Sequence, residues 1–282
     1  LEAADPSRLP LYGVPFAIKD NIDLAGVPTT AACPGYAYRP ERSASVVQRL
    51  IELGAVPTGK TNLDQFATGL NGLRSPYGGC RNSVLPAYPS GGSSSGSALA
   101  VALKLASFAL GTDTAGSGRV PAALNGLVGC KPTRGIVSTR GLVPCCPSLD
   151  CISFFARNAV DAAELLSHCA HYDGEHRYSR RNLLGNVTRR DRELPPFRFG
   201  VPRPAHLIWL GCAEAAGLFA AARSRLEALG GTAVELDFQP FFAAAKMLYE
   251  PAGAAERMAA FGSVLMDATG VLPVIREVVL AG

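Results

Sequence analysis

The stretch "PSGGSSSGSALAVALKLASFALGTDTAGSGRVPAALNGLVGCKPTRG" (residues 89–135) places two glycine-rich turns on either side of one apolar run. The apolar run, residues 98–110, is hydrophobic on most sides, which predicts a buried helix followed by a strand. The second turn is followed by Pro121, which indicates a short helix. Two serine-bearing turns therefore flank one buried helix, and both turns are candidates for chemistry.

A strand that carries a lysine is predicted well before these turns. In "VPFAIK" (14–19), Phe16 and Ile18 alternate with Ala17 and Lys19, and this period of two is typical of a strand. The lysine therefore lies in apolar surroundings, which makes it a candidate for an unusual protonation state.

Other segments extend an α/β pattern along the chain. The run "SVVQRLIEL" (45–53) predicts a helix, and "AVPTG" (55–59) predicts a short strand after it. Later, "FRFGV" (197–201), an alanine-rich helix at 213–229 and "TAVELDF" (232–238) indicate a strand, a helix and a strand. We find no internal repeat, and the predicted class is α/β.

The composition describes a globular chain and excludes several classes of protein. The 282 residues are 48% hydrophobic and 18% charged, which suits one large or two small domains. The formal net charge of +4 is too small to indicate nucleic-acid binding. No apolar run reaches the roughly 20 residues that cross a bilayer, and no secretory leader pattern is present, so we expect a cytosolic protein without a membrane partner.

The cysteines suggest neither disulfides nor a metal. Their spacing contains no CxxC pair, and in a chain of this size we interpret them as reduced core residues. The segment "CCPSLDC" (145–151) resembles a thiolate cluster, but adjacent side chains seldom point at one ion, so we expect no metal and no cofactor. The eight are Cys33, Cys80, Cys130, Cys145, Cys146, Cys151, Cys169 and Cys212.

One motif suggests a nucleotide site. The segment "GAVPTGKT" (54–61) fits the phosphate-loop pattern, which requires a strand directly before its first glycine so that backbone N–H groups converge on phosphate. Here a predicted helix leads into Gly54, and Pro57 has no N–H to offer. We therefore interpret Gly54 as the end of that helix and Lys60 as a structural or rim lysine.

The first serine turn raises the question of a histidine-dependent triad. The segment "GSSSG" (92–96) fits the nucleophile-elbow pattern with Ser94 at its centre. However, the preceding "LPAYPS" (85–90) carries two prolines and is a poor strand. Most of the histidines also fall at a helix end or in a polar segment, which is typical of exposed side chains. They are His168, His171, His176 and His206.

A lysine can replace the histidine as the base. Burial and nearby positive charge lower the pKa of a lysine from its reference value of about 10.4, and a neutral amine can then accept a proton from serine. Lys19 on its apolar strand is the candidate, and a second serine can relay the proton because a hydroxyl both donates and accepts. The turn "TDTAGSG" (112–118) offers consecutive N–H groups to a developing oxyanion.

Three segments together resemble the amidase signature family. They are "GVPFAIKDNID" (13–23), "GGSSSGSA" (91–98) and "GTDTAGSGRVPAALNGLVGCKPT" (111–133), and the resemblance covers most of residues 10–160. It implies the fold of that family, a mixed central β-sheet between α-helical layers. It also implies an amide hydrolase that needs no cofactor.

The resemblance further implies the roles of individual residues. The base corresponds to Lys19, the serine of a cis peptide bond to Ser93 and the nucleophile to Ser117, and the two serines are 24 residues apart as in the family. The oxyanion donors would be the backbone N–H groups of Thr114, Ala115, Gly116 and Ser117. Many members carry glycine in place of Ala115, which matters little if φ is negative there.

Within the family, several stretches resemble allophanate hydrolases. They include "KDNIDLAGVPTTAACPGYAY" (19–38), "TNLDQFATGLNGLRSPYG" (61–78) and "PSLDCISFFA" (147–156). The later segment "DFQPFFAAAKMLYEPAGAAERM" (237–258) resembles their substrate-binding helix, in which Tyr249 and Arg257 match the tyrosine and arginine that hold the substrate.

These matches imply a particular substrate. Allophanate is a urea that carries a carboxylate, and a guanidinium binds a carboxylate with two parallel hydrogen bonds. The resemblance therefore implies that a small anionic amide releases ammonia through an acyl-enzyme on Ser117. The alternative for Arg257 is a surface arginine on an amphipathic helix.

Other functions remain open from the sequence. Another amidase-signature activity, such as the glutaminase component of a transamidosome (the glutamyl-tRNA amidotransferase type), would use a neutral amide and partner chains, with no role for Arg257. A noncatalytic relative that serves as a binding module is disfavoured, because the chain keeps both Lys19 and Ser117.

We expect residues 1–282 to form one amidase signature domain that is incomplete at both ends. A polar linker-like loop is expected at 172–196, with its basic run from Arg177 to Arg192 in solvent. The chain opens at Leu1 rather than at a methionine, and we expect it to lack the separate C-terminal domain that allophanate hydrolases often carry. The family suggests a homodimer.

Overall fold

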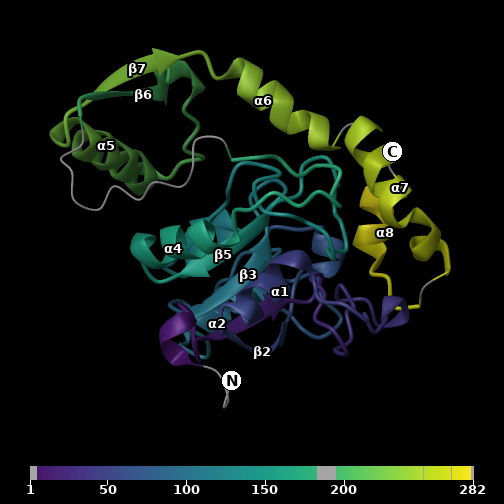
Figure 1. Cartoon of the computed structure of the whole chain (residues 1–282). Helices are drawn as coiled ribbons and strands as arrows, with labels where there is room; N and C mark the ends of the chain where they lie inside the picture. The colour runs from purple at the N-terminus through teal and green to yellow at the C-terminus, as the bar shows by residue number, and fades with distance from the viewer. Residues whose placement is uncertain (1–4, 183–194, 250, 268, 281–282) are drawn as a thin grey trace. The chain divides into compact units, whose positions relative to one another are not determined.

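The computed structural model describes residues 5–182, 195–249, 251–267 and 269–280 (Figure 1). Two compact units are formed by residues 1–186 with 251–282 and by residues 187–250. The strands are β1 (Pro15–Lys19), β2 (Val56–Thr61), β3 (Phe108–Thr112), β4 (Val128–Cys130), β5 (Ile152–Ala156), β6 (Phe197–Pro202) and β7 (Gly231–Leu236). The α-helices are α1 (Ser45–Glu52), α2 (Ser95–Ala102), α3 (Arg119–Leu124), α4 (Ala159–Cys169), α5 (Ala213–Ala228), α6 (Gln239–Lys246), α7 (Pro251–Asp267) and α8 (Pro273–Leu280). Short 3-10 helices are η1 (Pro6–Arg8), η2 (Pro34–Tyr36), η3 (Gln65–Ala67), η4 (Pro204–His206) and η5 (Met247–Tyr249).

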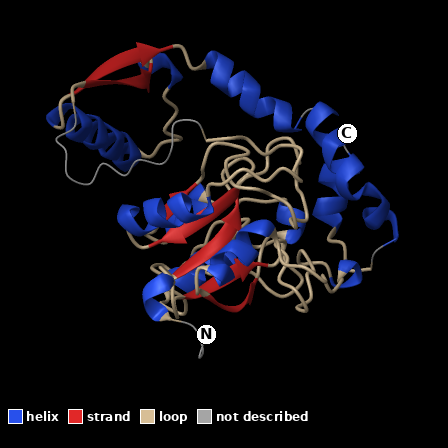
Figure 2. Ribbon diagram, in the orientation of Figure 1, coloured by secondary structure: helices blue, strands red, loops and turns tan. Residues whose placement is uncertain are grey.

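The larger unit is built around a five-stranded sheet in the order β2-β1-β3-β5-β4 (Figures 1 and 2). Strand β1 pairs in parallel with β2 and β3, whereas β5 pairs antiparallel with β3 and β4. Helices pack on both faces of this mixed sheet. The predicted fold, a mixed central sheet between helical layers, is confirmed.

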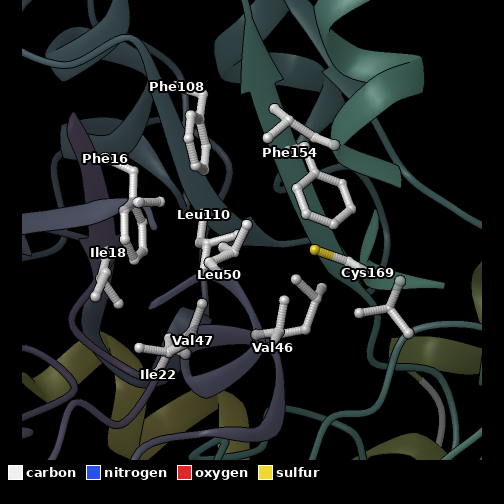
Figure 3. Close-up of a cluster of buried hydrophobic side chains, with 14 of the residues drawn as sticks. Phe16, Ile18, Ile22, Val46, Val47, Leu50, Phe108, Leu110, Phe154 and Cys169 are labelled. Atoms are coloured by element: carbon white, nitrogen blue, oxygen red, sulfur yellow. The ribbon is translucent and has the colours of Figure 1, made fainter. Parts of the chain in front are cut away.

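One face of the sheet carries the large apolar side chains. Because side chains alternate along a strand, Phe16 and Ile18 of β1 point to the same face as Phe108 and Leu110 of β3. The rings of Phe16 and Phe108 stack with their centroids 5.2 Å apart. Helices α1 and α4 cover this face, and the residues labelled in Figure 3 are Phe16, Ile18, Ile22, Val46, Val47, Leu50, Phe108, Leu110, Phe154 and Cys169.

The opposite face is lined by small side chains, which let α2 approach the strands closely. Ala17 of β1 and Ala109 of β3 pack against Ala98 of α2. A Cβ atom at Gly111 would lie only 2.8 Å from the hydroxyl oxygen of Ser94, the residue that caps α2. The serine-rich loop that begins α2 is therefore pressed against the carboxyl end of β3.

Helices α7 and α8 join the larger unit through a third apolar cluster. Phe261 of α7 stacks on Phe66, which follows β2, with ring centroids 4.9 Å apart. Ile275 and Val279 of α8 are fully buried in the same cluster. This packing attaches α7 to the loops that follow β1 and β2.

The smaller unit has the predicted order of strand, helix and strand. Strands β6 and β7 pair in parallel from Phe197 opposite Gly231 to Pro202 opposite Leu236. A parallel pair needs a long crossover, and α5 supplies it. Helix α6 and η5 follow β7 along the chain.

Other expectations from the sequence are met only in part. All eight cysteines are free, but Cys212 is exposed, so the prediction that every cysteine is a core residue is wrong. It precedes α5, a helix without buried residues. Of the linker-like loop at 172–196, residues 183–194 lie outside the described residues. Among the described residues, no helix combines the length and the apolar character needed to cross a membrane.

Two leucines allow the core to be tested. Leu110 on β3 is fully buried, whereas Leu105, in the loop before β3, is 70% exposed. We expect Leu110→Ala to lower the free energy of unfolding by about 2 to 5 kcal/mol, because it leaves a cavity between β1, β3 and α1. The matched change Leu105→Ala should cost less than about 0.5 kcal/mol. Urea unfolding measures both, and equal losses would contradict the assignment of the core.

Candidate active site

Lys19 and Thr112 end two neighbouring parallel strands, so their side chains meet at one edge of the sheet. Lys19 Nζ lies 2.6 Å from Thr112 Oγ1 and 2.7 Å from Ser93 Oγ. Lys19 is fully buried, and so is Ser93. The carboxyl ends of strands in α/β sheets are where ligands commonly bind. This edge therefore unites the predicted base with the predicted relay serine.

The surroundings of Lys19 favour its neutral form. Burial lowers the pKa of Lys19 to about 7, because desolvation disfavours the ammonium ion. Asp64, Asp113 and Asp150 act in the opposite direction through their charges, but burial outweighs them. Of the two causes expected from the sequence, burial is the one that lowers the pKa of Lys19, and the nearby charges act against it. A neutral amine at this position can accept the proton of Ser93.

Ser93 is held by its backbone as well as by Lys19. The peptide bond between Gly92 and Ser93 is cis, as the resemblance implies. The carbonyl oxygen of Ser93 accepts a hydrogen bond from the N–H of Asp64 at 3.1 Å. A Cβ atom at Gly92 would lie 2.1 Å from the carboxylate of Asp64, so only glycine fits beside Ser93.

Ser117 follows a turn that one carboxylate holds in shape. Asp113, directly after β3, accepts the N–H groups of Gly116 at 2.7 Å and Gly118 at 3.1 Å, and its ion pair with Arg119 measures 2.9 Å. Burial opposes the ionisation of Asp113, but the hydrogen bonds from Arg119 and the two N–H groups lower its pKa below the ordinary value. Within the described part of the chain, the Ser117 hydroxyl makes no hydrogen bond, which leaves its oxygen available for attack.

The predicted oxyanion hole needs one correction. The N–H of Gly116 points to Asp113 and is therefore not available to an oxyanion in this structure. The N–H groups of Thr114, Ala115 and Ser117 have no acceptor among the described residues. Ala115 has a negative φ, as expected, while Gly116 takes the positive value of +124° that favours glycine. Three of the four predicted donors remain.

The two serine turns touch each other through their backbones. The N–H of Ser94 donates to the carbonyl oxygen of Ser117 at 3.3 Å. Residues 93 and 117, far apart in the sequence, are therefore held at neighbouring positions beside Lys19. No hydrogen bond between the two serine hydroxyls occurs among the described contacts.

Sequence reasoning missed three polar residues of the site. Thr112 contacts the amine of Lys19, Asp113 shapes the turn, and Asp150 accepts a hydrogen bond from the Thr114 hydroxyl. Burial raises the pKa of Asp150 to about 6, although the hydrogen bonds from Thr114 and two backbone N–H groups favour its ionised form. A signal was present, because Thr112 and Asp113 stand in the same quoted turn as Ser117.

The triad centred on Ser94 is contradicted. Its hydroxyl is fully buried, donates to the carbonyl oxygen of Thr112 at 3.1 Å and accepts the N–H of Thr112 at 3.2 Å. The ring of His176 contacts Thr139, and that of His171 contacts the carbonyl oxygen of Cys169. Ser94 therefore anchors α2 to β3 and has no histidine partner among the described contacts.

The nucleotide site is contradicted as well. Lys60 lies within strand β2 and not in a loop before a helix. Its Nζ pairs with Asp20 at 2.9 Å and donates to Thr29 Oγ1 at 3.0 Å. The lysine of the apparent phosphate loop is thus a structural residue, as interpreted from the sequence.

The predicted substrate-binding segment is not one helix. It comprises α6, η5 and α7, so Tyr249 and Arg257 belong to different elements. The side chain of Tyr249 lies outside the described residues. Arg257 on α7 is only 3% exposed, which excludes a surface arginine. It interacts with the thiol of Cys145, whose electrostatic neighbours include Lys19.

The structure thus contains a buried lysine, a cis-bonded serine and a second serine in a glycine-rich turn, the arrangement that the resemblance to the amidase signature family implies. The Amidase family model matches residues 1–279, and the chain belongs to this family.

Particular members are similar over most of this chain. It is 49% identical over 254 residues to the urea amidolyase of Lachancea kluyveri, a match covering 90% of this chain and 14% of that protein. The structure of the allophanate hydrolase of Kluyveromyces lactis superposes with a TM-score of 0.89 at 45% identity, covering 98% of this chain and 45% of that one. A glutamyl-tRNA(Gln) amidotransferase chain from Acidobacterium capsulatum is 43% identical over 204 residues, 72% of this chain and 43% of that protein. The chain thus spans less than half the length of these relatives.

The pKa of Lys19 leads to a test of the base. Since only the neutral amine accepts a proton, kcat/KM for amide hydrolysis should fall by roughly tenfold for each pH unit below the pKa of about 7. Initial rates of ammonia release across this range measure the profile. Lys60→Ala serves as the control and should keep the same midpoint. A profile without a limb near neutrality would contradict Lys19 as the base.

Proposed function

We propose that the chain is the catalytic part of an amidase that hydrolyses allophanate and releases ammonia. The observation that carries the chemistry is the fully buried Lys19 amine, 2.7 Å from the Ser93 hydroxyl and with its pKa lowered to about 7. Similarity to the urea amidolyases and to an allophanate hydrolase supports the substrate. We further propose that both compact units belong to one amidase signature domain.

The proposed reaction starts with a proton relay. Ser117 passes its proton to Ser93 while Ser93 passes its own to neutral Lys19, and the Ser117 oxygen bonds to the carbonyl carbon of the terminal amide. The N–H groups of Thr114, Ala115 and Ser117 stabilise the oxyanion.

Collapse of this intermediate breaks the bond between carbon and nitrogen. The leaving nitrogen takes the proton back through Ser93 and departs as ammonia, which leaves the acyl group on Ser117. Water then attacks the acyl-enzyme and gives a proton to Lys19 through Ser93. Return of that proton to the Ser117 oxygen releases an N-carboxylated carbamate. No cofactor is needed for these steps.

Arg257 supports an anionic substrate. Arg257 is almost completely buried. The thiol of Cys145 has both Arg257 and Lys19 as electrostatic neighbours. A buried guanidinium binds a carboxylate strongly, since two parallel hydrogen bonds form where water does not compete. We propose that Arg257, with Tyr249, holds the carboxylate of allophanate.

A glutaminase of the amidotransferase type is the second candidate. Its support is the similarity to glutamyl-tRNA(Gln) amidotransferase chains, which covers a smaller share of this chain than the match to urea amidolyases. A neutral amide gives the charge of Arg257 no role in binding, and this favours allophanate. Two further proposals concern the whole protein. The free cysteines suit an enzyme of the cytosol, where thiols stay reduced. The family resemblance suggests that the protein forms a homodimer.

Single substitutions test the proposed catalytic set. Ser117→Ala and Lys19→Ala should each lower kcat by at least about a thousandfold, because each removes a group through which the proton must pass. Lys60→Ala is a matched lysine control and should keep most of kcat, since Lys60 only pairs with Asp20 and Thr29. Steady-state ammonia release measures all three, and turnover by Ser117→Ala would overturn the mechanism.

A substrate panel tests the proposed substrate. We expect ammonia from allophanate and little from urea, biuret, malonamide or glutamine. Arg257→Ala should raise KM for allophanate by about a hundredfold, the contribution of a buried charged pair, and Arg257→Lys should restore only part of it. Arg276→Ala on the neighbouring α8 is the matched control. Hydrolysis of neutral amides alone would refute the substrate and leave the catalytic set in place.

A further inference from the structure

The loop from Cys145 to Asp150 contacts α7 on one side and, on the other, the turn at residues 112–118, which we call the oxyanion turn because it carries the predicted oxyanion donors. The carboxylate of Asp150 is 4% exposed and accepts the hydroxyl of Thr114 from the turn. The same carboxylate accepts the N–H groups of Cys145 at 2.9 Å and Cys146 at 3.1 Å. One buried side chain thus binds the turn on one side and the loop on the other.

The two adjacent cysteines continue this connection to α7. Each cysteine gives its N–H to Asp150, and the thiol of Cys146 donates to a residue of α7. The Sγ atom of Cys146 lies 3.0 Å from Glu256 Oε2. The thiol of Cys145 donates to the carbonyl oxygen of Ala67 at 3.7 Å and has the guanidinium of Arg257 as an electrostatic neighbour. Cys146 therefore connects Asp150 to α7, and Cys145 lies in the electrostatic surroundings of Arg257.

A third residue of the loop strengthens the contact with α7. The hydroxyl of Ser148 donates to Glu256 Oε2 at 2.7 Å, and its N–H donates to Oε1 at 2.5 Å. These bonds lower the pKa of Glu256 although its partial burial has the opposite effect. Glu256 precedes Arg257 in the sequence, so the loop grips α7 beside the proposed substrate-binding guanidinium.

The loop has no helix or strand of its own, so these hydrogen bonds determine where it lies. Buried hydrogen bonds to a carboxylate are strong and directional, because no water replaces them. A shift of α7 therefore moves the loop, and the loop moves the Thr114 hydroxyl. The N–H of Thr114 is one of the three oxyanion donors, and small displacements of such donors reduce catalysis strongly.

We propose that Asp150 and the Cys145–Cys146 pair are positioning residues that couple the grip of Arg257 on the substrate carboxylate to the geometry of the oxyanion turn. The proposal rests on the proposed role of Arg257. An anion bound to Arg257 fixes α7, and the bonds through the dicysteine and Asp150 fix the N–H of Thr114. An anionic amide then has a higher kcat than a neutral one, in addition to the lower KM that tighter binding gives.

A double-mutant cycle on the full chain tests the coupling. Asp150→Asn and Thr114→Val each remove the link to the turn, and Thr114→Val keeps both the side-chain shape and the backbone N–H. Each should lower kcat for allophanate by about tenfold with little change in KM, because the donors are misplaced and not removed. In the Arg257→Ala background the same changes should lower kcat by no more than about twofold, since the coupling is already lost.

Asp173→Asn is the matched control. Asp173 is also a buried carboxylate, 7% exposed, and it accepts Ser138 Oγ at 2.7 Å and Arg140 Nε at 3.0 Å in a different loop. It should lower Tm without lowering kcat. Equal factors for Asp150→Asn with and without Arg257, or an unchanged kcat in Thr114→Val, would overturn the coupling.

Failure of the proposed function has a different signature. If the wild-type chain hydrolyses only neutral amides, allophanate is the wrong substrate. In that case kcat on the neutral amide is measured for Thr114→Val, Asp150→Asn and the control Asp173→Asn. These values decide whether Asp150 acts on the turn. A fall in kcat in the first two alone would support the link, and an equal effect in all three would refute it.

Discussion

The site depends on the burial of one amine. Lys19 has no exposed surface, and its nitrogen contacts the hydroxyls of Ser93 and Thr112. An ammonium ion in such a place is costly, so the protein tolerates the lysine by lowering its pKa to about 7. Desolvation of the ammonium ion lowers the free energy of unfolding, and it also keeps the amine neutral and able to accept a proton near neutral pH. The strands on both sides and the serine loop together keep water away from this nitrogen.

The unequal faces of the sheet explain how the serine loop reaches Lys19. One face uses phenylalanines and branched side chains to support α1 and α4, and they form the largest of the three clusters of buried apolar residues in the described part of the chain. The other face uses alanine and glycine, so α2 lies close to the strands and Ser94 bonds to the backbone of β3. Ser93 precedes that anchor and is thereby held beside the end of β1. A larger residue at Gly111 or Gly92 would separate the loop from the lysine.

Much of this arrangement could be predicted from the sequence. The features that were missed have one physical cause in common. Alternation along "VPFAIK" and the apolar run before β3 depend on local pattern, and both strands were found where expected. The roles of Lys19, Ser93 and Ser117 came from a family resemblance rather than from periodicity. Asp150 and the bond between Gly116 and Asp113 were missed, because they depend on which carboxylate meets which N–H after folding. That Tyr249 and Arg257 belong to different elements was missed for the same reason, since helical pattern alone does not place a 3-10 helix at residues 247–249.

The turn that carries Ser117 is held by two carboxylates in opposite electrostatic situations. Asp113 has a guanidinium partner in Arg119, and the hydrogen bonds from Arg119 and from the turn lower its pKa although burial opposes this. Asp150 has only hydroxyl and backbone N–H donors, and burial raises its pKa to about 6. Asp113 therefore holds the turn through an ion pair and bonds within the turn itself, whereas Asp150 shares its bonds between the turn and a loop that contacts α7. In the proposed mechanism, the first kind of contact keeps the turn rigid at Ser117, and the second links the turn to the helix that carries Arg257.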